Sequence, residues 1–95
     1  MNKHEYNVDM DMMFSPGHDW HADIWLPLDA QISEIHLRVY SFSFPDNVYS
    51  IEWGTIKSKG NRLQIPIDAS RPGHSAAEEA VRLAIDITYY SEAKK

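Results

Sequence analysis

A strict alternation of apolar and polar side chains constrains the fold of this chain more than any other feature. From residue 4 to residue 14, the even positions carry His4, Tyr6, Val8, Met10, Met12 and Phe14, and the odd positions are mostly polar. Residues 20–28 alternate in the same way. A period of two predicts half-buried β-strands. Ser15, Pro16 and Gly17 lie between the two segments and are typical turn residues, so we expect a hairpin.

Three further segments alternate with the same period, at residues 35–39, 49–53 and 63–67. We expect each to form a short strand, with turns at residues 45–47 and 58–61. Pro66 lies within the last segment and has no backbone N–H to donate. We therefore expect that strand to lie at an edge of the sheet or to end there.

The C-terminal part of the chain predicts a helix. Ser75 followed by Glu78 fits a capping box. On a helical wheel one broad arc is apolar and contains Ala77, Ala80, Val81, Leu83, Ala84, Ile85, Ile87 and Thr88. Arg82 has acids four residues away on both sides, Glu78 and Asp86, as in helix-stabilising ion pairs.

Strands followed by a helix predict an α+β fold. We expect a single domain over residues 1–95, with a four- to five-stranded antiparallel meander and one amphipathic C-terminal helix on one sheet face. The sequence has no cysteine, so it contains neither disulfides nor thiolate metal ligands. It also lacks a signal-peptide pattern and any apolar run of about 18 residues. These features favour a cytoplasmic location without a membrane partner.

The net charge of −5 is concentrated in the first third of the chain. The acids of residues 1–30 are Glu5, Asp9, Asp11, Asp19, Asp23 and Asp29, and Lys3 is the one base in that range. In residues 31–95 acids and bases are equal in number. Such a distribution disfavours direct binding of nucleic acid, whose phosphates it would repel. It favours a protein target with a basic surface, although an acidic surface that only maintains solubility gives the same pattern.

The interface residues that we expect are Asp9, Asp11, Asp23, Trp25 and His21. In the expected hairpin Asp11 lies opposite Asp23 or His21, and like charges that face each other cost stability, so this cluster needs either water or a partner. Trp25 alternates outward between acids, where an aromatic side chain can anchor a partner. We expect the carboxylates to contact Arg or Lys of the target. The expected function is a small acidic non-catalytic protein-binding domain. Inhibitor or immunity-type proteins of phages and mobile elements have this general character.

A metal site is the first alternative, with His18, His21 and Asp23 as ligands. Imidazole and carboxylate together suit Zn²⁺ or Mn²⁺. The spacing matches no established metal motif, and on a strand His18 and His21 point to opposite faces. The leading interpretation therefore includes no metal and no cofactor.

The sequence favours neither an enzyme nor any particular assembly. No catalytic motif with a nucleophile and a base at a defined spacing is present. A homo-oligomeric accessory domain is the second alternative. A homodimer would form through the expected edge strand at residues 63–67, although Pro66 limits this pairing.

Overall fold

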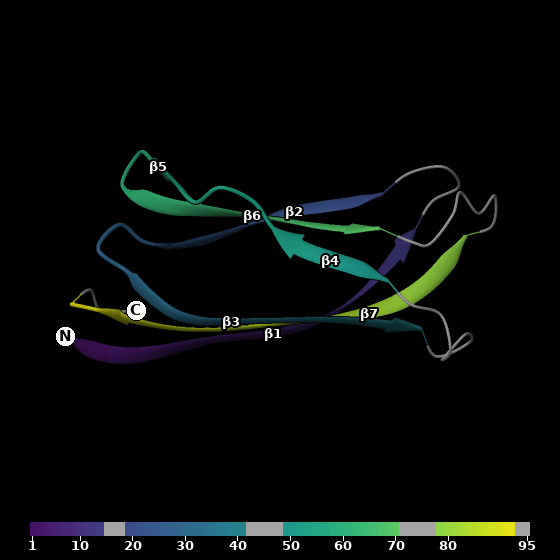
Figure 1. The fold of residues 1–95 in the computed structure, drawn as a ribbon, viewed down its shortest axis with the longest axis horizontal. Helices are drawn as coiled ribbons and strands as arrows, with labels where there is room; N and C mark the ends of the chain where they lie inside the picture. Colours follow the sequence, from purple (N-terminus) through teal and green to yellow (C-terminus); the bar gives the residue numbers. More distant parts are fainter. Residues whose placement is uncertain (15–18, 42–48, 71–77, 93–95) are drawn as a thin grey trace.

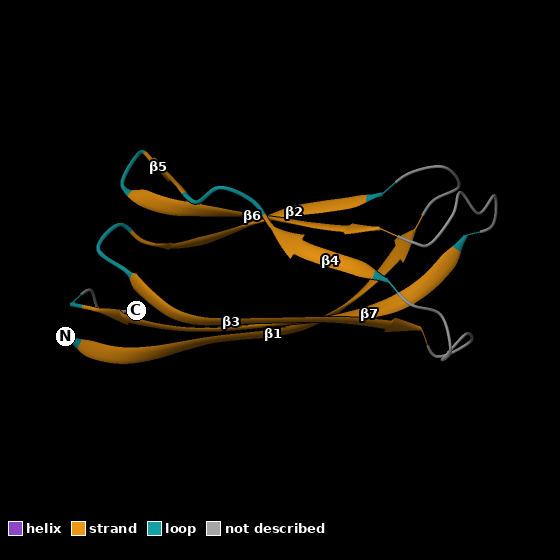
Figure 2. Cartoon of the chain, viewed as in Figure 1, coloured by secondary structure: helices purple, strands orange, loops and turns teal. Residues whose placement is uncertain are grey.

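The computed structural model describes residues 1–14, 19–41, 49–70 and 78–92, which form seven β-strands (Figures 1 and 2). The strands are β1 (Asn2–Phe14), β2 (Trp20–Pro27), β3 (Gln31–Ser41), β4 (Ser50–Trp53), β5 (Lys57–Lys59), β6 (Arg62–Ser70) and β7 (Glu79–Ser91). They make two antiparallel sheets that lie one over the other, as Figure 1 shows.

The first sheet, called here the β7 sheet, has the order β1–β7–β3. β1 pairs with β7 without interruption along its whole length. On the other side, β3 pairs with β7 with one irregularity, between Ile32 and Glu34. The second sheet, called here the β6 sheet, has β2 on one side of β6 and β4 followed by β5 on the other.

The core lies between the two central strands. Ile65 and Ile67 of β6 and Leu83, Ile85 and Ile87 of β7 are fully buried. Because strand side chains alternate between the two faces, the residues between these point outward. Each sheet therefore has an apolar inner face and a mostly polar outer face.

The expected C-terminal helix is wrong, because residues 79–91 form β7 and the described residues contain no helix. Val81, Leu83, Ile85 and Ile87 are buried, with Arg82 and Asp86 less buried between them. The alanines at 80 and 84 filled gaps in the helical arc and concealed this alternation. The expected α+β class is therefore wrong, and the described structure is all-β. Arg82 forms an ion pair with Asp11 on the neighbouring strand in place of the expected pairs along a helix.

The expected meander is also wrong. β1 and β2 lie in different sheets, so they do not form a hairpin. Asp11 lies opposite Arg82, and Asp23 lies opposite Pro66.

The turn at residues 58–61 is confirmed as the β5–β6 connection, where Gly60 adopts a φ of 63°. That conformation is favourable for glycine.

Pro66 does not mark an edge, since β6 is the central strand of its sheet. A proline in a central strand removes one hydrogen bond from the ladder. Here the neighbouring strand is interrupted at the same level, between the end of β4 and the start of β5. The ladder therefore has a gap where the missing N–H would have been needed.

Within the described ranges, no helix has the length and apolar character needed to cross a membrane.

Candidate functional site

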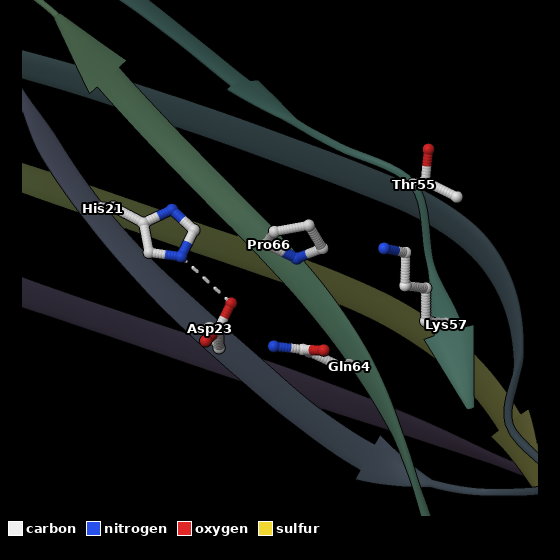
Figure 3. Close-up of a pocket in the computed structure, with 6 residues that line it drawn as sticks. All are labelled: His21, Asp23, Thr55, Lys57, Gln64 and Pro66. Carbon is white, nitrogen blue, oxygen red and sulfur yellow. Dashed lines mark ion pairs between the residues drawn. The ribbon is translucent and has the colours of Figure 1, made fainter. Parts of the chain in front are cut away.

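The outer face of the β6 sheet contains a hollow of about 300 Å³ (Figure 3). The side chains that line it come from β2, β5, β6 and the segment that joins β4 to β5. They are His21, Asp23, Thr55, Lys57, Gln64 and Pro66. Figure 3 shows Pro66 in the middle, with His21 and Asp23 on one side and Lys57 on the other.

The interruption between β4 and β5 lies directly beside the hollow. Gly54 donates its N–H to the carbonyl of Pro66 over 2.8 Å, which holds the interrupted segment against β6. A Cβ on Gly54 would lie 3.1 Å from Cγ of Pro66. A Cβ at this position would therefore be tight, and the ring of Pro66 would have to shift by a few tenths of an ångström to accept it.

Two carboxylates hold the imidazole of His21. Nδ1 lies 2.7 Å from Oδ1 of Asp68, and Nε2 lies 3.2 Å from Oδ1 of Asp23. The hydrogen bond to Asp68 is the main cause that raises the pKa of His21, and the charge of Asp23 acts in the same direction. Both nitrogens donate only when the ring is protonated, so this arrangement favours the imidazolium.

The carboxylate of Asp23 has an unsatisfied acceptor. Its Oδ1 is shielded from solvent and makes no well-aligned hydrogen bond within the described part of the chain. The 3.2 Å approach of His21 is therefore an ion pair of poor hydrogen-bond geometry. A shielded acceptor that lacks a donor is costly. The Asp23 side chain as a whole keeps 29% of its surface exposed.

Charged and aromatic groups surround the hollow on the same face. Trp25 lies two residues beyond Asp23 on β2, opposite Gln64, and keeps 40% of its surface exposed. Glu52 and Asp68 lie opposite each other near His21. At the other end of the sheet, the basic residues are Lys57, Lys59 and Arg62. The face therefore has an acidic end and a basic end, with the hollow between them.

The structure does not bring Asp9 and Asp11 to this site. Both are exposed on the outer face of the β7 sheet, whereas Asp23 and Trp25 are on the outer face of the β6 sheet. Asp11 accepts a 2.9 Å hydrogen bond from Nε of Arg82, which is the main cause that lowers the pKa of Asp11. Asp9 makes no ion pair with any described residue. The acids of the first third therefore lie on opposite faces and do not form one surface.

Another of these acids, Asp29, has a local structural role. It lies in the turn after β2, where it accepts hydrogen bonds from Oγ of Ser91 over 2.6 Å and from N of Glu92 over 2.8 Å. The Ser91 hydroxyl is the main cause that lowers the pKa of Asp29. The turn between β2 and β3 is thereby tied to the end of β7.

The alternative metal site is not assembled by the residues that can be seen. His18 lies outside the described residues. Both nitrogens of His21 already face carboxylates. Over the described ranges, no group of three or more His, Asp or Glu side chains is arranged to hold a metal ion.

Sequence reasoning identified His21, Asp23 and Trp25 of this face but missed the residues on β6 and β5. Asp68 is far from His21 in the sequence, and their contact depends on the pairing of β2 with β6. Lys57 and Gln64 reach the hollow through the pairing of β5 with β6. The one local signal was Pro66 inside an apolar alternating segment, which marked an irregularity in the sheet.

Comparison of the chain with models of protein families, with curated proteins and with solved structures finds no match. Any functional conclusion therefore depends on the geometry of the site.

Proposed function

We propose that this protein is a non-catalytic binding domain that recognises a basic side chain of a protein partner at the hollow of the β6 sheet. The observation that carries the proposal is the carboxylate of Asp23 at the wall of the hollow, whose shielded Oδ1 has only a poorly aligned ion pair with His21 among the described residues. An Arg or Lys of the partner would donate to the Asp23 carboxylate, which keeps 29% of its side-chain surface exposed. Charge-assisted hydrogen bonds to carboxylates are stronger than neutral ones.

The surroundings of Asp23 support a peptide segment as the ligand. Trp25 offers an exposed aromatic surface beside the hollow, and aromatic faces attract cations. Lys57 lines the opposite side of the hollow, where it can donate to a carbonyl or carboxylate of the same partner segment. The recognised element is thus a basic side chain next to a hydrogen-bond acceptor.

The state of His21 supports binding over catalysis. A general base must have a free nitrogen to accept a proton from a substrate. Both nitrogens of His21 face carboxylates, and its raised pKa favours the protonated form. In this role His21 partly compensates the charges of Asp23 and Asp68.

The wider role in this proposal is that of a small inhibitor or immunity-type protein acting in the cytoplasm. The net charge of −5 favours approach to a basic target surface. The acids of β1 would contribute to that attraction at a distance without touching the target. Binding should therefore weaken as salt is added.

Backbone amide shifts measured by NMR during titration test the site directly. The probe is N-acetyl-arginine amide, and the matched control ligand is N-acetyl-citrulline amide, which has a similar shape and no charge. We expect saturable shifts at Asp23, Gln64 and Lys57 with the arginine probe, and at least tenfold weaker binding of the citrulline probe. Equal responses to both ligands, or none near the hollow, would refute recognition of a cation at this site.

A matched pair of variants assigns the face. Asp23→Asn removes the charge at the hollow, and Asp9→Asn makes the same chemical change on the opposite sheet. The arginine response and the capture of a protein partner should both be lost in Asp23→Asn and kept in Asp9→Asn. The reverse result would place the interface on the β7 sheet.

A further inference from the structure

β1 is a long, regular strand whose outer side pairs with no other described strand. It runs from Asn2 to Phe14, and among the described strands it pairs only with β7. Its pairing with β7 shows no irregularity, and it contains no proline. Such an edge exposes a row of backbone donors and acceptors that can pair with another strand.

The other described edges each have a feature that limits further pairing. β3 has an irregularity between Ile32 and Glu34. β4 and β5 are separated by residues 54–56, and β5 has lysines at both of its ends. β2 is shorter and ends at Pro27. Irregularities, lysines and prolines commonly protect edge strands from pairing with another chain. Of these features β1 contains only one lysine, Lys3.

We infer that two copies of this chain associate by antiparallel pairing of β1 with β1, about a two-fold axis that passes through Tyr6. The two β7 sheets would then become one continuous sheet. A closed two-fold contact of this kind is the commonest form of homo-oligomer. The inference concerns the β7 sheet and does not depend on the function proposed for the hollow.

The charges on the outer face of β1 select this register. With Tyr6 on the axis, Lys3 lies opposite the partner's Asp9, and Glu5 lies opposite the partner's Asn7. Four other registers keep the inner side chains inward and pair a stretch of β1 that is at least as long. Each of them places an acid opposite an acid. Centres at Asn7 and Val8 oppose Glu5 to an aspartate, and centres at Asp9 and Met10 oppose aspartates to each other. Like charges directly opposite each other are destabilising.

The inner side chains of β1 also favour a neighbour on this side. Tyr6 and Met10 pack against the core but remain only partly buried, and Val8 between them is half-buried. In the inferred dimer the two Tyr6 side chains face each other, and Val8 lies opposite the partner's His4. The second copy would cover apolar surface that a single copy leaves partly exposed.

A charge-swap experiment tests the contact without touching the core. Light scattering coupled to size exclusion should give twice the 11.0 kDa of one chain at high micromolar concentration. Lys3→Glu places a glutamate opposite the partner's Asp9, and the two-fold axis repeats this pair of acids. The dissociation constant should therefore rise about tenfold. Adding Asp9→Lys to Lys3→Glu should restore association. Lys59→Glu makes the same charge change on the β6 sheet and should have no effect.

A disulfide trap tests the register. The chain has no cysteine, so a single introduced cysteine can form a disulfide only between copies. Tyr6→Cys should cross-link on mild oxidation, because residue 6 meets itself on the axis, and Val8→Cys should not. A monomer at all concentrations, or a dimer that Lys3→Glu leaves intact, would overturn the inference. Cross-linking through Val8→Cys in preference to Tyr6→Cys would overturn the register.

Discussion

The neighbouring tyrosines at the end of β7 give a direct test of how this strand lies. Tyr89 points into the core with 2% of its surface exposed and stacks on His4, with ring centroids 5.2 Å apart. Tyr90 points outward with 38% exposed. The two side chains have identical composition, so Tyr89→Ala and Tyr90→Ala differ only in where they remove it.

The expected effects follow from burial. Burying about 200 Å² of an aromatic side chain is worth up to about 5 kcal/mol at about 25 cal/mol per Å², and truncation of buried aromatics costs about 3–5 kcal/mol. We expect Tyr89→Ala to lower the free energy of unfolding by that amount and Tyr90→Ala to lower it by less than about 1 kcal/mol. A chain of this size has a total stability of about 5–14 kcal/mol. The first loss is therefore a large part of the whole, and it corresponds to a fall in Tm of about 12 °C or more.

Urea unfolding followed by fluorescence and circular dichroism measures both variants. The denaturant slopes should be compared first, because only equal slopes make the two free energies comparable. In a helix that continued through residue 89, Tyr89 would lie on the polar face with Arg82 and Asp86. A loss at Tyr89 no larger than the loss at Tyr90 would refute the inward orientation of Tyr89 and with it the register of β7.

Four further predictions concern the β6 sheet. Asp68 raises the pKa of His21 above its unfolded value. The contribution of His21 to stability is therefore complete below about pH 6.5 and is lost as pH rises through the folded pKa. Between pH 5 and pH 9, the urea midpoint should fall less steeply in His21→Asn than in the unmodified protein. Gly54→Ala should move the ring of Pro66 by a few tenths of an ångström and cost about 1 kcal/mol, with amide shifts confined to the hollow. Gly60→Ala should cost about 1–2 kcal/mol through its left-handed φ, although no atom lies within 4 Å of the added Cβ; shifts confined to the β5–β6 turn would confirm this cause. Zn²⁺, Mn²⁺ or EDTA should leave the melting midpoint unchanged, and a rise with metal would show that the native chain binds that metal.

The positions of most strands could be predicted from the sequence, because alternation is a local property. The segments at residues 4–14 and 20–28 correspond closely to β1 and β2. Pairing partners could not be predicted in the same way. β1 pairs with the last strand of the chain, and β2 pairs with β6. Such pairs depend on contacts between distant segments, which a reading of local patterns does not include.

The error at β7 has a specific physical origin. Val81, Leu83, Ile85 and Ile87 alternate as in a strand, but Ala84 between them also completes a helical arc. Ala84 lies in β7 between Asp9 and Arg38 of the neighbouring strands and is 2% exposed. The enrichment in β-branched side chains was the sequence signal in favour of a strand.

The candidate site was found only in part for the same reason. His21, Asp23 and Trp25 were singled out because they alternate on one strand. Their true neighbours on β6 and β5 depend on sheet pairing. The expected grouping with Asp9 and Asp11 failed because it depended on a hairpin that the chain does not form.

The position of residues 79–91 as a central strand determines which side chains share a face, so it is the claim to test most directly. Backbone NMR assignment with cross-strand NOE measurements does so in one experiment. The structure predicts strand-type secondary shifts throughout β7, with contacts between Tyr6 and Ile87 on one side and between Leu37 and Ile85 on the other. Helical secondary shifts in this segment, with NOE contacts between residues i and i+3, would contradict the fold. They would also contradict the separation of the two faces and the site built on it.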